Sequence, residues 1–164
     1  MLVRSLSALL LLVLFAPTAS AQVTITVEGL VGVVPDTDDP LSGLTDPFVR
    51  VFVEGTLVGQ TATVNGTLTP IWTDTFSILV TLDANTTPTA TIELQVYDED
   101  LNSDEFLGTA TYEYDWVNGA TESLTLPFSG PLGDGEIGLR VSSQLEPVAG
   151  DEESFGSLKS RYDD

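Results

Sequence analysis

The sequence predicts an all-β fold, an antiparallel β-sandwich of about eight strands. Short segments of alternating apolar and polar residues recur along the chain, divided by turns that contain Gly, Pro, Asn and Asp. Threonine is abundant, and its branched β-carbon favours strands over helices. No stretch has the 3.6-residue apolar period of an amphipathic helix. The 164 residues, of which 42% are hydrophobic, suffice for one domain with a packed core.

Residues 1–21 have the three parts of a secretory signal peptide. Arg4 supplies a positive charge, and Leu9–Phe15 is an apolar run too short to span a membrane comfortably as a retained anchor. Ala19 and Ala21 place small residues where a signal peptidase needs them. We therefore expect cleavage after Ala21 and a protein that is secreted to the extracellular space or the periplasm.

The strand pattern begins directly after this segment. Val23, Ile25 and Val27 alternate with threonines, as in a half-buried strand. In chain order the predicted strands are 23–27, 47–53, 59–64, 73–80, 91–97, 106–112, 122–126 and 136–141. In the second of these the three valines face inward, while Arg50 points outward between two phenylalanines. Residues 22–145 therefore form the predicted sandwich domain.

The pattern ends before residues 146–164, which are rich in Gly, Ser, Asp and Glu. We expect a flexible acidic C-terminal tail there. Its last part, Lys159–Tyr162, leaves open a role as a tether or a partner-binding peptide.

The charge and the missing residue types exclude several functions. Five Lys and Arg face 25 Asp and Glu, so the net charge is −20. A chain this acidic cannot neutralise a phosphate backbone, which excludes nucleic acid as a partner. Cys and His are absent, which excludes disulfides, Cys or His zinc sites and histidine-based triads. The acidity suits cation binding, solubility in salt, or both.

Carboxylates concentrate in two predicted loops, Asp36–Asp46 and Asp98–Glu105. Asp98 and Asp100 are two residues apart at a strand end, so both can turn toward one point. Calcium takes about six to eight oxygen ligands in irregular geometry, and a bound cation would relieve the repulsion within such a cluster. Acidic loops that simply solvate a very acidic protein have the same spacing, so both interpretations stay open at this point.

Three motifs bear on this choice. Thr45–Val51 (TDPFVRV) resembles the S-D-P-Y-V-x-V signature of C2 domains. Asn65–Phe76 is similar to the family's N-T-L-N-P-V-W-N-E-x-F segment. Leu94–Asp100, followed by Asp104–Gly108 (DEFLG), resembles its third calcium loop. The motifs occur in the family's order, and the resemblance covers about residues 23–141.

The resemblance implies an eight-stranded sandwich of C2 type that binds calcium. One strand precedes the first loop and one follows at the end, which is similar to the permuted variant found in phospholipases. The arrangement around Asp98 is similar to the secreted, calcium-triggered C2 module of perforin. The implied calcium ligands are Asp39 or alternatively Asp38, with Asp39 favoured, together with Asp46, Asp98, Asp100, Asp104 and Glu105.

C2 domains bind phospholipid through these loops, with apolar loop-tip residues entering the membrane interface. Leu41, Leu44 and Leu101 are the candidates for insertion here, although ordinary loop packing would also explain them. Arg50 and Arg140 are the domain's basic residues, so it has no polybasic patch. Membrane binding must therefore depend on calcium or use zwitterionic lipid.

The resulting hypothesis is a secreted, monomeric, non-catalytic C2 module that docks reversibly on phospholipid membranes when calcium binds. The alternative is an extracellular adhesion or scaffold module in which calcium only stabilises the loops and the partner is a protein or a glycan. An enzyme that uses paired carboxylates on glycosides is the weakest possibility, because such acids need a cleft and loop-tip acids on a small domain offer little of one.

Overall fold

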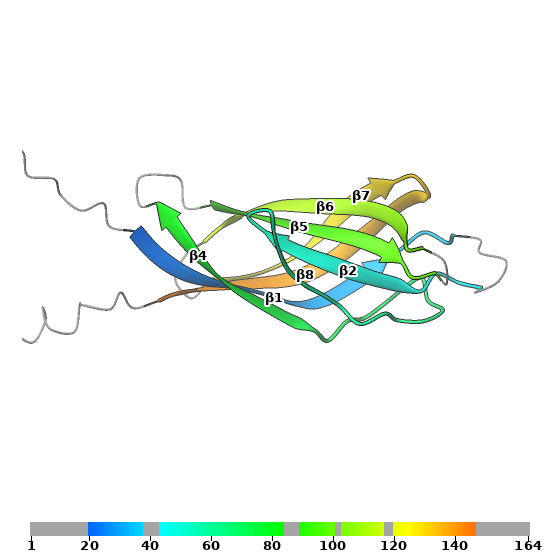
Figure 1. The fold of residues 1–164 in the computed structure, drawn as a ribbon, viewed down its shortest axis with the longest axis horizontal. Coiled ribbons are helices and arrows are strands. Elements are labelled where there is room, and N and C mark those ends of the chain that lie inside the picture. The colour runs from blue at the N-terminus through cyan, green and yellow to red at the C-terminus, as the bar shows by residue number, and fades with distance from the viewer. Residues whose placement is uncertain (1–19, 38–42, 84–88, 101–102, 117–119, 147–164) are drawn as a thin grey trace, which may run out of the picture.

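The protein is an elongated, two-layered β-sandwich whose strands run along its length (Figure 1). The structure is a computed structural model, and it describes residues 20–37, 43–83, 89–100, 103–116 and 120–146. Its strands are β1 (Ser20–Val33), β2 (Pro47–Val53), β3 (Thr56–Gln60), β4 (Thr75–Asp83), β5 (Thr89–Asp98), β6 (Glu105–Asp115), β7 (Thr121–Gly130) and β8 (Gly133–Leu145). Within the described ranges there is no helix that could cross a membrane. The predicted all-β class with eight strands is confirmed.

The strands are antiparallel neighbours in the order β3-β2-β5-β6-β7-β8-β1-β4. Among the described residues β6 and β7 pair at a single position, Thr109 with Ser129. Two four-stranded layers, β3-β2-β5-β6 and β7-β8-β1-β4, therefore meet along that line. One strand, β1, precedes the first acidic loop, and the last strand, β8, pairs with it. This is the strand order expected for the permuted variant.

The core lies between the two layers and is built from alternating strand residues. Val23, Ile25 and Val27 of β1 are buried, as predicted, and so are the three valines of β2. Trp72 is also buried, and its indole Nε1 donates a hydrogen bond to the carbonyl of Pro47, 3.3 Å away. Each buried aliphatic side chain contributes about 1.5–3 kcal/mol through the hydrophobic effect. The alternation in the sequence therefore accounts for most of the core.

The third strand differs from its predicted position at 59–64. Glu54 and Gly55 both have positive φ, 51° and 70°, and they form a tight two-residue connection between β2 and β3. The hairpin therefore begins at Thr56 and its second strand ends at Gln60. Beyond that point the chain stays beside β2 without being part of the strand: the amide of Thr61 donates to the carbonyl of Val49, and its hydroxyl accepts a hydrogen bond from the amide of Val49, both over 2.9 Å.

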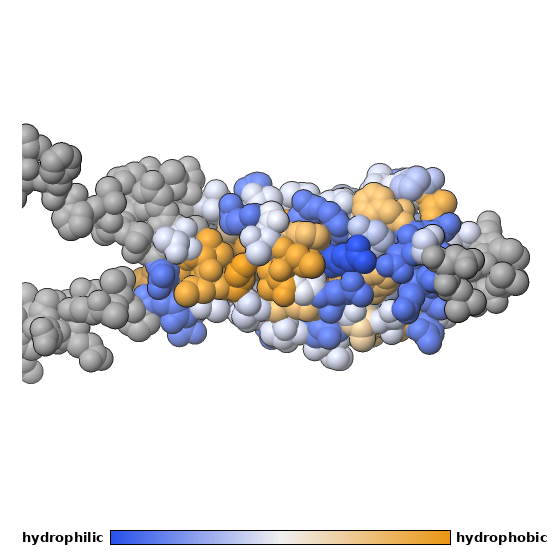
Figure 2. Space-filling view, viewed as in Figure 1, coloured by the Kyte–Doolittle hydropathy of each residue, from blue (hydrophilic) through white to orange (hydrophobic). Residues whose placement is uncertain are grey.

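The described residues of the two acidic loops lie at one pole of the sandwich, together with the β3–β4 connection and the turn from β7 to β8 (Figure 1). The β3–β4 connection lies along the second half of β1, where the amide of Gly32 donates to the carbonyl of Pro70 (3.0 Å) and the amide of Trp72 to the carbonyl of Leu30 (2.9 Å). The start of β1 and the end of β8 lie at the opposite pole. On the face shown in Figure 2, hydrophilic residues are concentrated near the loop pole, and apolar residues lie along the middle of that face.

Candidate metal centre

Asp98, the last residue of β5, is the buried anchor of the loop pole. Asp98 is only 1% exposed to solvent. One carboxyl oxygen, Oδ1, accepts a hydrogen bond from the backbone amide of Asp46 (2.6 Å), and Oδ2 accepts one from the hydroxyl of Thr37 (2.7 Å). Burying a carboxyl group is costly unless such donors replace water. The two bonds therefore fix both described flanks of the first acidic loop against the end of β5.

Asp46 extends this connection to the β3–β4 loop. Its Oδ1 accepts a 2.5 Å hydrogen bond from the amide of Gly66, and its carbonyl accepts one from the amide of Glu99 (3.0 Å). The neighbouring Thr45 is buried, and its hydroxyl donates to the carbonyl of Pro35 over 2.8 Å. The hydrogen bonds of Asp46 and Asp98 therefore connect three loops to one another: the β1–β2 loop, the β3–β4 loop and the β5–β6 loop.

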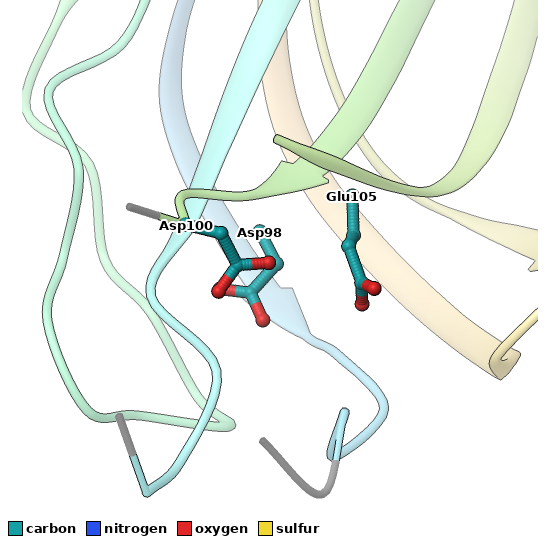
Figure 3. A group of neighbouring side chains, drawn as sticks. All are labelled: Asp98, Asp100 and Glu105. Carbon is teal, nitrogen blue, oxygen red and sulfur yellow. The ribbon is translucent and has the colours of Figure 1, made fainter. Parts of the chain in front are cut away.

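Asp98, Asp100 and Glu105 form the one group of possible metal ligands found among the described residues. Each offers a carboxyl oxygen, and these oxygens lie within 4.8 Å of one another. Asp98 pairs directly with Glu105 across β5 and β6, after a register shift that follows Val96. The three carboxyl groups point to the same side, beyond the ends of these strands (Figure 3).

The geometry of this group fits a hard divalent cation. Two oxygens that bind the same calcium ion at about 2.3–2.6 Å lie at most about 5 Å apart, and the three carboxyl groups meet that limit. Their oxygens are also the ligand type that calcium prefers over softer nitrogen or sulfur donors. The centre combines Asp98, which is buried, with Asp100, half-buried, and Glu105, exposed, so it is open to solvent on one side.

The remaining predicted ligands are placed differently. Asp46 lies beside the centre, where its backbone amide contacts Asp98. Asp104 is absent from the three-carboxyl group and pairs with Arg50, with 3.2 Å between Oδ2 and the guanidinium nitrogen. Asp39 and its alternative Asp38 lie outside the described residues.

The candidates for membrane insertion are described only in part. Leu44 is 43% exposed, in keeping with a loop-tip position. Leu41 and Leu101 lie outside the described residues. Further exposed apolar side chains at this pole include Phe106, Leu132 and Val33, the last residue of β1. The sequence offered no reason to single out Leu132, because the turn from β7 to β8 carries no motif.

Sequence reasoning did not identify Thr37 or Gly66 as parts of the site. Thr37 lies inside the first acidic stretch, but a hydroxyl in a threonine-rich chain has no distinctive spacing. Gly66 acts through its backbone amide, which no residue pattern reveals. The partner of Asp104 was also missed, because Arg50 is distant in sequence and looked like an ordinary outward-facing residue.

Comparison with known proteins is consistent with this fold. The sequence model of the family described as "C2 domain" matches residues 21–124. A stretch of 68 residues is 35% identical to Extended synaptotagmin-1 of Mus musculus and 34% identical to that of Rattus norvegicus, and covers 42% of this chain. The chain spans only 6% of the length of these curated relatives. They are extended synaptotagmins, so they give no support to the closer resemblance to perforin.

Solved structures share the fold at low sequence identity. A single C2 domain of plant Extended Synaptotagmin 1 has a TM-score of 0.62 at 19% identity, covering 76% of this chain and 96% of that one. Human GIVD cytosolic phospholipase A2 has a TM-score of 0.62 at 24% identity, covering 78% and 17%. The calcium-bound pair of C2 domains from Extended-Synaptotagmin 2 has a TM-score of 0.57 at 21% identity, covering 73% and 45%.

Proposed function

The chain belongs to the C2 domain family, and from this premise we propose that it is a non-catalytic, calcium-binding module that docks reversibly on phospholipid membranes. The observation that carries the proposal is the group of three carboxyl groups within 4.8 Å at the loop pole. The loops around this group are already cross-linked by hydrogen bonds to Asp98 and Asp46. A site organised in this way loses little conformational entropy when an ion binds.

Asp98, Asp100 and Glu105 would hold the ion, and the resemblance adds Asp46 and Asp39 as further ligands. Bound calcium supplies positive charge that attracts the phosphate of a lipid headgroup to the loop pole. Leu44, together with Leu41 and Leu101, would then enter the membrane interface. Burial of their apolar surface contributes about 25 cal/mol per Å² to binding.

Charge makes this binding conditional on the ion. In the described part of the chain the cations are Arg50 and Arg140, and each is paired with an acid of its own domain, Asp104 and Glu28. The protein as a whole carries a net charge of −20. An anionic membrane therefore repels the protein until cations neutralise the loops.

Two measurements test the proposal on the same protein. Calcium, compared with magnesium at matched ionic strength, should raise the melting temperature, because a ligand that binds only the native state stabilises it. Calcium should also cause cosedimentation with vesicles of phosphatidylcholine and phosphatidylserine, reversed by EDTA. The double variant Asp100→Asn/Glu105→Gln should lose both effects, since it removes two ligands and spares the buried Asp98.

A matched control is available at the other end of β6. Glu113→Gln/Asp115→Asn makes the same chemical change at two exposed positions and should behave as wild type. Wild-type protein that neither gains stability nor sediments would contradict the proposal. A calcium-dependent melting temperature without vesicle binding would instead favour the adhesion or scaffold alternative, in which a protein or glycan is the partner.

We also propose that residues 1–21 are an export signal and that the acidic tail predicted at 146–164 follows the domain of residues 22–145. Glu146 itself is tied to the domain, because its amide donates a 2.8 Å hydrogen bond to the carbonyl of Gln22, so the tail proper starts after it. Support for the signal comes from its sequence, because residues 1–19 lie outside the described ranges, whereas Ser20 and Ala21 form the start of β1, opposite Asp83 and Leu82. Cleavage after Ala21 would shorten β1 by these two residues. N-terminal sequencing of protein recovered from the medium or the periplasm should begin at Gln22. Recovery of the chain only inside the cell with Met1 in place would overturn this part of the proposal.

A further inference from the structure

Arg50 and Asp104 form an ion pair at the edge of the candidate metal centre. We propose that Arg50 keeps Asp104 out of this centre and thereby sets how much negative charge the centre offers to calcium. The inference rests on the proposed function, because it concerns the affinity of the same site. Three structural observations support it.

The guanidinium of Arg50 is fixed on the outer face of β2 and β5 by contacts on several sides. Its Nε donates a 3.1 Å hydrogen bond to Oε1 of Gln60 on β3. Its central carbon lies 4.4 Å from the ring centroid of Tyr97 and 5.4 Å from that of Phe48. Cations are attracted to aromatic faces at such distances. The side chain is 32% exposed, so it is partly shielded from water.

The aromatic platform under Arg50 is itself rigid. Phe48 and Tyr97 are opposite each other in the β2–β5 register and stack with 5.3 Å between their centroids. Tyr97 contacts Phe106 of β6 edge-on at 5.4 Å. Phe48 is only 1% exposed although it lies on the outer face, because Tyr97 and Arg50 lie against it. Arg50 therefore occupies a defined position rather than a mobile one.

Asp104 and Glu105 are neighbours in sequence but serve different contacts. Glu105 contributes to the three-carboxyl group, whereas the carboxyl of Asp104 bonds to the guanidinium of Arg50 over 3.2 Å. Glu105 is the first residue of β6 and is held by its pairing with Asp98, whereas Asp104 precedes the strand and its side chain is held by Arg50. The contact with Arg50 is therefore what separates Asp104 from the three-carboxyl group.

The pair has a consequence for calcium affinity. While Arg50 neutralises it, Asp104 adds neither a ligand nor an uncompensated negative charge to the centre. Without Arg50, the loop that carries Asp104 gains a free carboxyl group one residue from Glu105. The affinity of calcium sites depends on the number of charged ligands. Removing Arg50 should therefore tighten calcium binding instead of weakening it.

Calorimetric titration with calcium tests this through a double-mutant cycle. Arg50→Gln should tighten binding by about tenfold, a difference of about 1.4 kcal/mol. Asp104→Asn should weaken binding by only about twofold in the wild-type background, but by about tenfold in the Arg50→Gln background, where the carboxyl group is available. Equal costs of Asp104→Asn in both backgrounds would mean that the two charges act only through space, and would overturn the inference.

The second ion pair of the described residues provides the matched control. Arg140 of β8 pairs with Glu28 of β1, in the other layer of the sandwich. Arg140→Gln removes the same charge there and should leave the calcium dissociation constant within about twofold of wild type. If Arg140→Gln tightens binding as much as Arg50→Gln, the effect is one of net charge and the proposal is wrong.

Melting temperatures in EDTA give a readout that does not involve the ion. Arg50→Gln should stay folded with a modest loss of stability, because exposed ion pairs contribute little. Arg50→Met is the second variant if Arg50→Gln does not fold, since the unbranched methionine side chain still covers Phe48 and Tyr97. Wild-type protein without calcium binding would contradict the proposed function, whereas an unchanged dissociation constant in both Arg50 variants would overturn this inference alone.

Discussion

At the scale of single residues, the hydroxyl of Thr37 has a structural role that its sequence context conceals. It donates to Oδ2 of Asp98, a carboxyl group that is almost fully buried. Thr37→Val keeps the shape of the side chain but leaves that oxygen without its donor. We expect a loss of about 1–3 kcal/mol in the free energy of unfolding, measured by urea denaturation in EDTA.

The comparison for this variant is Thr26→Val on β1. Thr26 shares an exposed hydrogen bond of 2.9 Å with Ser77, where water can replace the lost partner. Its substitution should change the unfolding free energy by less than about 0.5 kcal/mol. Equal losses at the two positions would show that the buried contact to Asp98 has no special weight.

Tyr112 gives the protein a sensitivity to alkaline pH. A hydrogen bond of 2.5 Å from its hydroxyl to Oε2 of Glu122, together with burial, raises the pKa of Tyr112 to about 12. In the unfolded chain the hydroxyl has its ordinary pKa near 10. The native state therefore binds more protons between these values, so stability falls as pH rises from about 10 toward 12.

Tyr112→Phe should flatten this part of the stability curve. Urea denaturation at pH 9 and pH 11 measures it, and wild type should lose more free energy of unfolding between the two than the variant does. Below pH 9 the tyrosine stays protonated in both states and contributes no slope. The same slope in both proteins would contradict the assignment to Tyr112.

Residue patterns predicted the carboxylates of the site better than their partners. Asp98 and Asp100, two apart at a strand end, could be recognised by spacing, and the structure brings them together with Glu105. The ion pair of Asp104 with Arg50 could not be recognised, because it joins a residue of β2 to the residue just before β6, 54 positions further along the chain. Such contacts depend on strand register, which the alternation of a single strand does not encode.

At the scale of elements, close backbone approach determines how the two layers join. Among the described residues β6 and β7 pair only at Thr109 and Ser129, and β7 ends at the next residue, Gly130. A Cβ atom added to Gly130 would lie 1.7 Å from the carbonyl oxygen of Leu107, so only glycine fits there. Gly130→Ala must therefore displace backbone on β6 or β7. We expect a loss of about 3 kcal/mol or more, measured by chemical denaturation.

Gly55 serves as the control for this substitution. Its φ is +70°, and a side-chain carbon added there would meet nothing within 4 Å. Gly55→Ala should cost only the backbone strain of the left-handed conformation, about 1–2 kcal/mol. A smaller loss for Gly130→Ala than for Gly55→Ala would mean that the junction between β6 and β7 yields easily.

The identity of the strands was predictable, but their ends were less so. The run 23–27 identified β1 by its alternation, yet β1 continues to Val33. Its extension passes a register shift between Glu28 and Val31, where Gly29 has a φ of +61°. A bulge shifts the alternation by one residue, so a period-two pattern ends there even though the strand continues.

At the scale of the whole molecule, charge repulsion dominates the electrostatics. The net charge is −20, and the described residues contain two ion pairs, Arg50 with Asp104 and Arg140 with Glu28. Dissolved salt therefore screens more repulsions between carboxylates than attractions between arginines and carboxylates. Raising NaCl from about 0.05 to 1 M in EDTA should raise the melting temperature by several degrees. KCl should act equally, and a fall in melting temperature would mean that specific ion pairs outweigh the repulsion.

The two ends of the sandwich emerge side by side, because the amide of Glu146 donates a 2.8 Å hydrogen bond to the carbonyl of Gln22. Both lie at the pole opposite the acidic loops (Figure 1). A handle at either end, such as a dye, a surface linker or a fusion partner, therefore leaves the carboxyl groups unobstructed. A protein immobilised through such a handle has its acidic loops directed away from the support and into solution. This is the orientation that a surface-binding assay needs.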